Sequence, residues 1–131
     1  MQSMFDKNPP KVFVQPSSIH GLGVFAAQDI TSGEIIEKAP ILKLDIQEKD
    51  ALLADYRFWW EQAGKRIYYV LALGYGSLYN HSSNPSGYFT NNIEDYTIDF
   101  IATKDIKKGE EILVDYGGEE YWSSRKYVEV K

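Results

Sequence analysis

The sequence predicts a single small domain that is mostly β with one main helix. Three observations favour this class: the apolar segments are short, turn residues separate them at close intervals, and helical spacing is convincing in only one segment. The 131 residues suffice for one domain and leave no room for a second. Residues 1–10 end in Asn-Pro-Pro and are expected to form a flexible arm, so the single domain is expected to cover residues 11–131.

The strands are expected where β-branched and aromatic residues run between turn residues. The clearest is 96–101, where polar and apolar side chains alternate in Tyr-Thr-Ile-Asp-Phe-Ile. Pro40 is expected to end one strand before the next begins, because proline cannot donate a backbone hydrogen bond. The predicted strands are 11–15, 24–28, 35–39, 41–44, 66–73, 96–101 and 110–115, and residues 74–87 are dense in turn residues.

The main helix is predicted for residues 47–62. Asp45 is placed to cap its start, and Gly64 stands where a helix would stop. A short closing helix is expected in the tail after Gly118. The apolar side chains that recur at spacings of three and four in the main helix are Leu52, Leu53, Tyr56, Trp59 and Trp60.

Composition and charge exclude several functions. The chain has 14 basic and 19 acidic residues and a formal net charge of -5, so duplex nucleic acid is not an expected partner. With no cysteine and two histidines it cannot form a disulfide, a cysteine zinc site or a thiol nucleophile, and no metal is expected. No apolar run approaches the roughly 20 residues of a membrane span, and residues 1–10 lack the apolar region of a secretory signal, so no such signal is expected. A soluble protein of the cytoplasm or nucleus is therefore expected, with no membrane partner.

Residues 21–26, Gly-Leu-Gly-Val-Phe-Ala, match the G-x-G-x-x-A fingerprint of dinucleotide-binding βαβ units. That fingerprint should follow a strand directly and open a helix, yet six residues separate Val14 from Gly21, and Gly33 interrupts the chain soon afterwards. A glycine-rich turn between two strands is the favoured interpretation. Its bare backbone would allow another molecule to approach closely.

Residues 79–85 also carry misleading short motifs. Asn80-His81-Ser82 matches a glycosylation sequon, but a chain without signal peptide or cysteine gives no reason to expect secretion. A serine nucleophile is not supported, because no G-x-S-x-G elbow is present. Taken alone, this segment is typical of a turn.

Read together and in order, three segments resemble the signatures of SET-domain protein lysine methyltransferases. They are 21–26, Tyr-Asn-His-Ser-Ser-Asn-Pro at 79–85, and Gly-Glu-Glu-Ile-Leu-Val-Asp-Tyr-Gly at 109–117. The likeness covers residues 12–122 and is greatest to the small, stand-alone viral and bacterial SET proteins. It implies a SET domain of several small sheets, a knot-like threading of the C-terminal segment past the Asn-His turn, and a short post-SET-like tail at 118–131.

The resemblance implies S-adenosylmethionine as the methyl donor. It gives Tyr116 as the catalytic tyrosine and Tyr56 as an aromatic beside the donor and the lysine, although plain core packing is the alternative for Tyr56 and Trp122. The residues implied to bind the donor are His20, Gly21, Leu22, Gly23, Asn80, His81 and Trp122. The residues implied to line the lysine channel are Tyr56, Val114, Tyr116 and Tyr121.

The chemistry agrees with these residue types. Methyl transfer is an in-line displacement that depends on alignment, and a lysine amine must lose its proton before it can attack. An aromatic channel lowers the lysine pKa by desolvation and attracts its stem by cation–π contact, and the 10 tyrosines could line one. The acidic net charge favours a basic protein as substrate, with a histone tail the family's usual partner. A microbial or viral origin would place the protein in the cytoplasm or a host nucleus.

Several positions depart from the family pattern. Ser86 stands where a second asparagine is expected, Ser83 replaces a cysteine, and Leu22 replaces an aromatic. Val114 stands where many relatives carry the aromatic that limits the number of methyl groups added, so the product state stays open. A SET-like binding module without turnover and a dehydrogenase are the alternative functions, and a homodimer is a further expectation drawn from the viral relatives.

Overall fold

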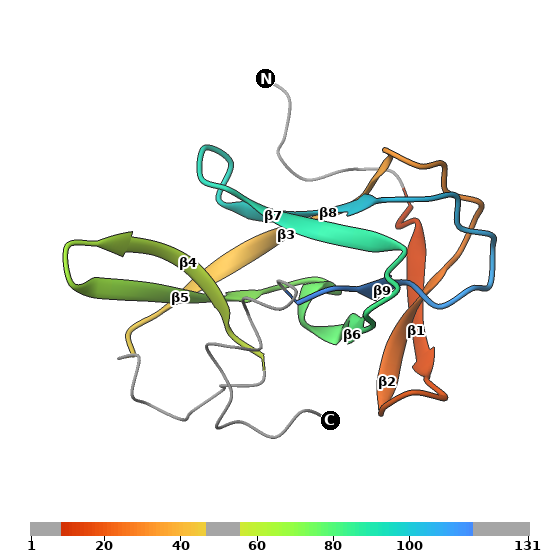
Figure 1. The fold of residues 1–131 in the computed structure, drawn as a ribbon, viewed down its shortest axis with the longest axis horizontal. Coiled ribbons are helices and arrows are strands. Elements are labelled where there is room, and N and C mark those ends of the chain that lie inside the picture. The colour runs from red at the N-terminus through yellow and green to blue at the C-terminus, as the bar shows by residue number, and fades with distance from the viewer. Residues whose placement is uncertain (1–8, 47–55, 117–131) are drawn as a thin grey trace.

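The computed structural model describes residues 9–46 and 56–116, which consist almost entirely of β-strands and connecting turns (Figure 1). The mostly β class predicted from the sequence is confirmed. The elements are β1 (Val12–Pro16), β2 (Leu22–Ala26), β3 (Ile35–Leu44), β4 (Phe58–Ala63), β5 (Arg66–Ala72), the 3-10 helix η1 (Gly76–Leu78), β6 (Asn80–His81), β7 (Gly87–Asn92), β8 (Thr97–Ala102) and β9 (Leu113–Val114). Within these two ranges, no helix has the length and apolar character that a membrane span requires.

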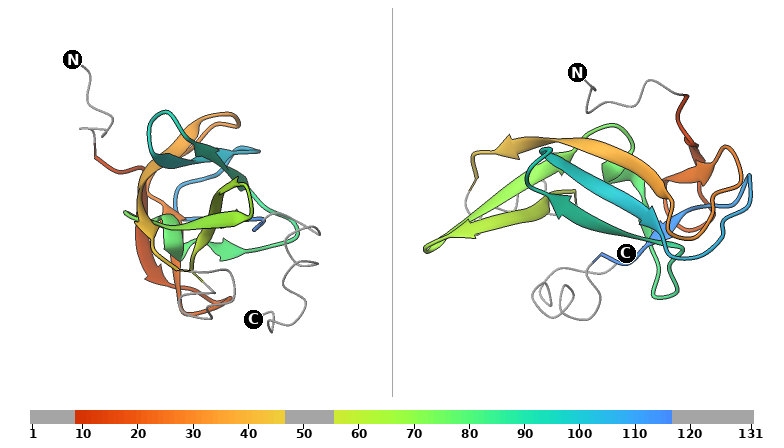
Figure 2. Two further views of the ribbon diagram at one scale, coloured as in Figure 1. Left: turned by 90° about the vertical axis from the view of Figure 1, so that its left-hand side faces the viewer. Right: turned by 90° about the horizontal axis from the view of Figure 1, so that it is seen from above.

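The strands form two sheets. β1 and β2 make an antiparallel hairpin in which Phe13 stacks on Phe25, and the other strands form one sheet in the order β4-β5-β3-β8-β7-β9-β6. The β1–β2 and β4–β5 hairpins lie at opposite ends of the molecule (Figures 1 and 2). Three strands separate β4 from β7 in the larger sheet, yet the Asn91 side-chain amide on β7 donates to the Trp59 and Trp60 carbonyls on β4, at 2.9 and 3.0 Å. The sheet is therefore strongly curled.

β3 is one continuous strand, so the predicted break at Pro40 is wrong. Residues 35–40 of β3 pair with β8, whereas residues 41–44 pair with β5 on the other side. Pro40 lies where the strand changes partners, and its carbonyl accepts the Leu73 N–H at 2.7 Å. Proline cannot donate a ladder hydrogen bond, and here it lies at the point where β3 changes partner strands.

The helix predicted for residues 47–62 is wrong at its C-terminal end. Residues 58–62 belong to β4, while residues 47–55 lie outside the described residues, as does the short helix expected after residue 118. Trp60 is 1% exposed and Trp59 is 53% exposed, so neighbouring side chains point to opposite sides, as in a strand. Phe58 meets Phe89 of β7 edge to face at 5.0 Å. Tertiary packing of the aromatic rings has overridden the helical spacing.

Other strand boundaries differ in smaller ways. Of the strand predicted at 110–115, only Leu113 and Val114 form β9, although Glu111 makes an isolated bridge to Phe25. β7 was not predicted, because its sequence, Gly-Tyr-Phe-Thr-Asn-Asn, ends in turn-forming residues. The turn-rich region 74–87 contains η1 and the two-residue strand β6.

The core fixes the start of the Asn-His segment. Tyr79 is 2% exposed and its ring stacks on Phe100 with 4.3 Å between ring centroids. Asn80 follows directly in the chain, so the packing of Tyr79 helps to fix the position of the Asn80 main chain. The largest fully buried side chains are Trp60, Tyr79, Phe100, Ile30, Ile98, Ile112, Val24, Val70, Val114 and Thr97.

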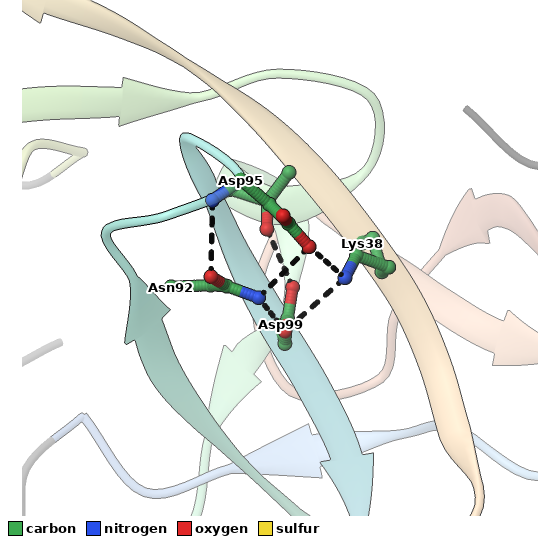
Figure 3. A network of polar contacts seen from close by, with 5 residues as sticks. Lys38, Asn92, Asp95 and Asp99 are labelled. Carbon is green, nitrogen blue, oxygen red and sulfur yellow. Dashed lines mark hydrogen bonds and ion pairs between the residues drawn. The ribbon is translucent and has the colours of Figure 1, made fainter. Parts of the chain in front are cut away.

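A polar cluster fastens the turn between β7 and β8 to β3 (Figure 3). Lys38 Nζ lies 2.7 Å from Asp95 Oδ2 and 3.7 Å from Asp99 Oδ2. The Asn92 side-chain amide donates to both carboxylates, at 3.2 and 3.0 Å. The hydrogen bond from Lys38 holds the pKa of Asp95 below its usual range and raises the pKa of Lys38.

Removal of the Asp99 carboxylate should destabilise the domain more than removal of the Asp95 carboxylate. Asp99 is 7% exposed and accepts a hydrogen bond of 2.7 Å from the buried Thr97 hydroxyl. Asp99→Ala leaves that hydroxyl without this acceptor, and an unsatisfied buried polar group costs about 1–3 kcal/mol. The more exposed Asp95 is expected to contribute much less. Urea unfolding of Asp99→Ala, Asp95→Ala and the unmodified chain measures the difference, and equal losses in the two variants would contradict this account.

Candidate active site

Three segments that lie far apart in the sequence meet at one place. β6 pairs in parallel with β9, which brings the Asn-His segment beside the segment that leads to Tyr116. The Ile112 N–H donates to the Val24 carbonyl at 2.8 Å, so β2 lies against the same segment. The segments 21–26, 79–85 and 109–116 are therefore joined by main-chain hydrogen bonds.

The side chain of Asn80 connects these three segments. Its Nδ2 atom lies 3.0 Å from the His20 carbonyl oxygen, 3.2 Å from the Leu22 carbonyl oxygen and 2.9 Å from Glu111 Oε2. Asn80 is 8% exposed, so these bonds form largely out of contact with water. The two N–H hydrogens of one amide thus orient the main chain at residues 20–22 and a carboxylate from the third segment.

Glu111 also belongs to this site, although its role was not predicted from the sequence. Its carboxylate accepts hydrogen bonds from Asn80 and from the Ser17 hydroxyl, the latter at 2.8 Å. A Cβ atom on Gly23 would collide with Glu111 Oε2, so the glycine is required for the carboxylate to reach its partners. Gly23 was predicted to bind the donor, and in the structure its visible role is to make room for Glu111. The signal that could have indicated Glu111 is its place directly after Gly-Glu in the third motif.

Tyr116 and His81 lie against each other just after β9. Their ring centroids are 5.2 Å apart, and the Tyr116 N–H donates to His81 Nδ1 at 3.2 Å. The Tyr116 hydroxyl donates a hydrogen bond to the main-chain carbonyl of Tyr79. This bond fixes the direction of the hydroxyl group, so its oxygen is held in one orientation.

Ser86 attaches the turn after His81 to β9. Its N–H donates to the Leu113 carbonyl at 2.9 Å, and its hydroxyl oxygen accepts the Leu113 N–H at 3.2 Å. The Ser82 N–H donates to the Val114 carbonyl at 3.1 Å. The serine that stands in place of the expected second asparagine therefore keeps the turn bound to the site.

The predicted donor-binding loop lies at the end of the β1–β2 hairpin. His20, Gly21 and Leu22 are exposed, and Leu22 is 52% exposed. The antiparallel pairing of β2 with β1 agrees with the turn interpretation of the G-x-G segment, which, in the part of the chain that the structure describes, does not open a βαβ unit.

The predicted channel residues differ in their placement. Tyr56 is 54% exposed just before β4, whereas Val114 is 1% exposed and packs in the core. Tyr121 and Trp122 lie outside the described residues. Among residues 9–46 and 56–116, no group of three or more His, Cys, Asp or Glu side chains is placed to hold a metal ion.

The comparison with protein families identifies the fold. The model of the SET domain matches residues 21–117, which span all three segments of the site. The chain belongs to the SET-domain family. The resemblance found in the sequence is thereby confirmed, while the knot-like threading stays a prediction.

This SET domain is similar to proteins named as histone methyltransferases. It is 32% identical over 102 residues to a histone-lysine N-methyltransferase of Schizosaccharomyces pombe that is specific for lysine 37 of histone H3, and the match covers 74% of this chain and 67% of that protein. A solved structure of a candidate histone methyltransferase of Plasmodium falciparum has a TM-score of 0.70 and 36% identity, and covers 87% of this chain and 99% of its own. These likenesses support protein-lysine methyltransferase activity.

A SET8 protein of Cryptosporidium shares the fold of this SET domain. The TM-score is 0.62 at 23% identity, and the match covers 81% of this chain and 57% of the Cryptosporidium chain. At this identity, the likeness concerns the fold alone.

Proposed function

We propose that the protein is an S-adenosylmethionine-dependent protein lysine N-methyltransferase that acts on a basic protein. The observation that carries this proposal is the convergence of the three family segments: Asn80 bonds to the main chain at residues 20–22, and Tyr116 bonds to His81, which lies next to Asn80 on β6. The chemistry needs alignment more than it needs an acid or a nucleophile from the protein, and a site fixed by hydrogen bonds provides alignment.

The main chain at residues 20–22, together with Asn80 and His81, would hold the donor. Gly21 has a φ of 47°, and a Cβ atom placed on it would meet nothing within 4 Å, so a ligand can approach bare backbone there. Asn80 orients the neighbouring carbonyls, and the Glu111 carboxylate provides negative charge beside them. When bound, S-adenosylmethionine supplies a methyl group on a cationic sulfonium. The exposed backbone and the negative charge fit such a group, and Trp122 is proposed to cover it.

Tyr116 is the proposed catalytic residue. Its hydroxyl is held by the Tyr79 carbonyl, so the phenolic oxygen occupies a fixed position before a substrate arrives. A preorganised oxygen can hold polarised C–H groups by weak hydrogen bonds and stabilise positive charge as it moves during the displacement. It does so without any rearrangement of the protein at the moment of reaction.

The substrate lysine must be neutral when it attacks. Its ordinary pKa is about 10.4, so only a small fraction is neutral at pH 7. We propose that Tyr56, Tyr116 and Tyr121 line the channel, where desolvation lowers the lysine pKa and cation–π attraction guides the side chain.

The expected substrate is a basic protein, with a histone tail as the first candidate. The formal net charge of the chain is -5, and electrostatic attraction accelerates the encounter with a basic peptide. The two relatives named as histone methyltransferases support the same class of substrate. A homodimer, and residence in the cytoplasm or a host nucleus, stay predictions of the sequence.

Calorimetry with S-adenosylmethionine and mass spectrometry of a basic peptide library test the proposed function. We expect saturable binding heat from the donor and methylated lysine in a subset of peptides. Binding heat without any methylated lysine would favour the alternative, a SET-like binding module that lacks turnover. Absence of both would overturn the proposal.

A further inference from the structure

A partly buried acid, Glu37, contacts the residue that holds the proposed catalytic tyrosine and has no part in the mechanism described so far. Glu37 on β3 accepts the Tyr79 hydroxyl through Oε1 at 2.7 Å and the Tyr75 N–H through Oε2 at 2.9 Å. Tyr75 caps the start of η1 and Tyr79 follows its last residue. One carboxylate therefore holds both ends of segment 75–79.

Segment 75–79 leads directly into the site. The main-chain carbonyl of Tyr79 accepts the hydroxyl of Tyr116, and Asn80 and His81 come next in the chain. Tyr79 thus makes three anchoring contacts. Its hydroxyl donates to Glu37, its ring stacks on Phe100, and its carbonyl accepts the Tyr116 hydroxyl. A shift of the Tyr79 ring would move the carbonyl that orients the Tyr116 hydroxyl.

The local sequence is adapted to this carboxylate. A Cβ atom on Gly74, whose φ is 63°, would lie 2.6 Å from Glu37 Oε2. A Cβ atom on Gly76 would collide with the Ala72 side chain. Both glycines therefore allow the chain to pass close to β3 and β5, which keeps the segment near Glu37.

Burial of the Glu37 carboxylate carries a desolvation cost, which its two hydrogen bonds partly offset. Burial raises the pKa of the Glu37 carboxyl, and the hydrogen bonds from the Tyr75 N–H and the Tyr79 hydroxyl oppose that rise. Burial, together with the negative charge and the hydrogen bond of Glu37, also raises the pKa of the Tyr79 hydroxyl, so Tyr79 remains a hydrogen-bond donor. An apolar side chain would avoid the desolvation cost but could accept neither hydrogen bond.

We propose that Glu37 is a positioning residue for methyl transfer, which acts on Tyr116 through the hydroxyl, ring and carbonyl of Tyr79. This inference rests on the proposed function. Asn80 has independent anchors in the carbonyls of His20 and Leu22 and in Glu111. Loss of the Glu37 contact should therefore affect turnover more than it affects donor binding.

The test compares Glu37→Gln, Tyr79→Phe and the double variant in the full chain. We expect each single variant to lower kcat about 10-fold, which corresponds to about 1.4 kcal/mol, with a donor dissociation constant that changes less than about 2-fold. Glutamine at position 37 is neutral and offers one oxygen to the two donors, whereas Tyr79→Phe removes the hydroxyl. Because both changes act on the same contact, the double variant should be no slower than the slower single variant. Glu34→Gln is the matched control: it removes one negative charge beside the start of β3, from a carboxylate bound to Lys11 at 2.7 Å, and should leave kcat unchanged.

The outcomes separate this inference from the proposed function. An active unmodified enzyme with unchanged kcat in Tyr79→Phe would overturn the positioning role and leave the methyltransferase proposal intact. Independent, multiplicative losses in the double variant would also overturn it, as would equal losses of kcat and donor affinity. If Glu37→Gln does not fold, Tyr79→Phe alone decides, through kcat and donor affinity. An unmodified chain without methyl transfer would overturn both proposals.

Discussion

Tyr116→Phe should abolish most of the methyl transfer while donor binding remains close to normal. The substitution removes only the hydroxyl that is fixed on the Tyr79 carbonyl. Phenylalanine keeps the aromatic ring beside His81 and the main-chain N–H that donates to His81 Nδ1. Removal of one preorganised group that stabilises the transition state typically lowers kcat by about 10²–10³-fold. Steady-state kinetics and calorimetry with the donor give the two quantities.

Tyr88→Phe is the control for Tyr116→Phe. Tyr88 lies on β7 with 46% of its surface exposed, and Tyr88→Phe also removes one tyrosine hydroxyl. We expect normal kcat in this variant. Normal kcat in Tyr116→Phe, or a loss of donor affinity that matches the loss of kcat, would contradict the role assigned to the hydroxyl.

Asn80→Ala should lower both the stability of the domain and its affinity for the donor. The amide donates to two main-chain carbonyls and to Glu111, so its removal leaves three acceptors without this donor, one of them charged. We expect a loss of about 2–3 kcal/mol in the free energy of unfolding. Donor affinity should fall as well, because the main chain at residues 20–22 loses the group that orients it.

Asn80→Asp and Asn84→Ala sharpen the test of Asn80. An aspartate at position 80 would place a second carboxylate against Glu111, so we expect at least as large a loss as with alanine. Asn84 is exposed in the turn that follows, and Asn84→Ala should unfold close to the unmodified chain. Urea unfolding and donor calorimetry measure these effects. Unmodified stability and affinity in Asn80→Ala would show that the three segments are held together by other contacts.

The fold could be predicted in part because local patterns reflect local structure. The alternation in residues 96–101 indicated a strand, and this region forms β8. Its polar residues are not on a solvated face, however, since Thr97 is 1% and Asp99 is 7% exposed. Asp99 can be buried because Lys38 of the neighbouring strand supplies a positive charge, and Thr97 can be buried because its hydroxyl donates to Asp99. A charged partner on another strand cannot be recognised from the sequence around Asp99.

The error in the predicted helix has the same origin. Trp59 and Trp60 fit a helical spacing with the residues before them, but residues 58–63 pair with β5. The side-chain amide of Asn91, on a strand more than 30 residues away, donates hydrogen bonds to the carbonyls of both tryptophans. The contacts that determine this segment are long-range, so a periodicity test within a window of residues could not detect them.

The site could be predicted as far as its motifs reach. The family pattern pointed to Asn80, His81 and Tyr116, and the structure brings these residues together. Glu111 and Glu37 were missed because their roles depend on partners distant in the chain. Glu37 lies 42 positions before Tyr79, and Ser17 lies 94 positions before Glu111.

Tandem mass spectrometry of a methylated peptide tests the central claim most directly. A basic peptide is incubated with the protein and with S-adenosylmethionine whose transferable methyl group carries deuterium, and the label is then located within the peptide. The account predicts labelled methyl on the side-chain nitrogen of a lysine, with far less label from Tyr116→Phe at a saturating donor concentration. No labelled lysine from the unmodified protein, or equal labelling by the two proteins, would contradict it.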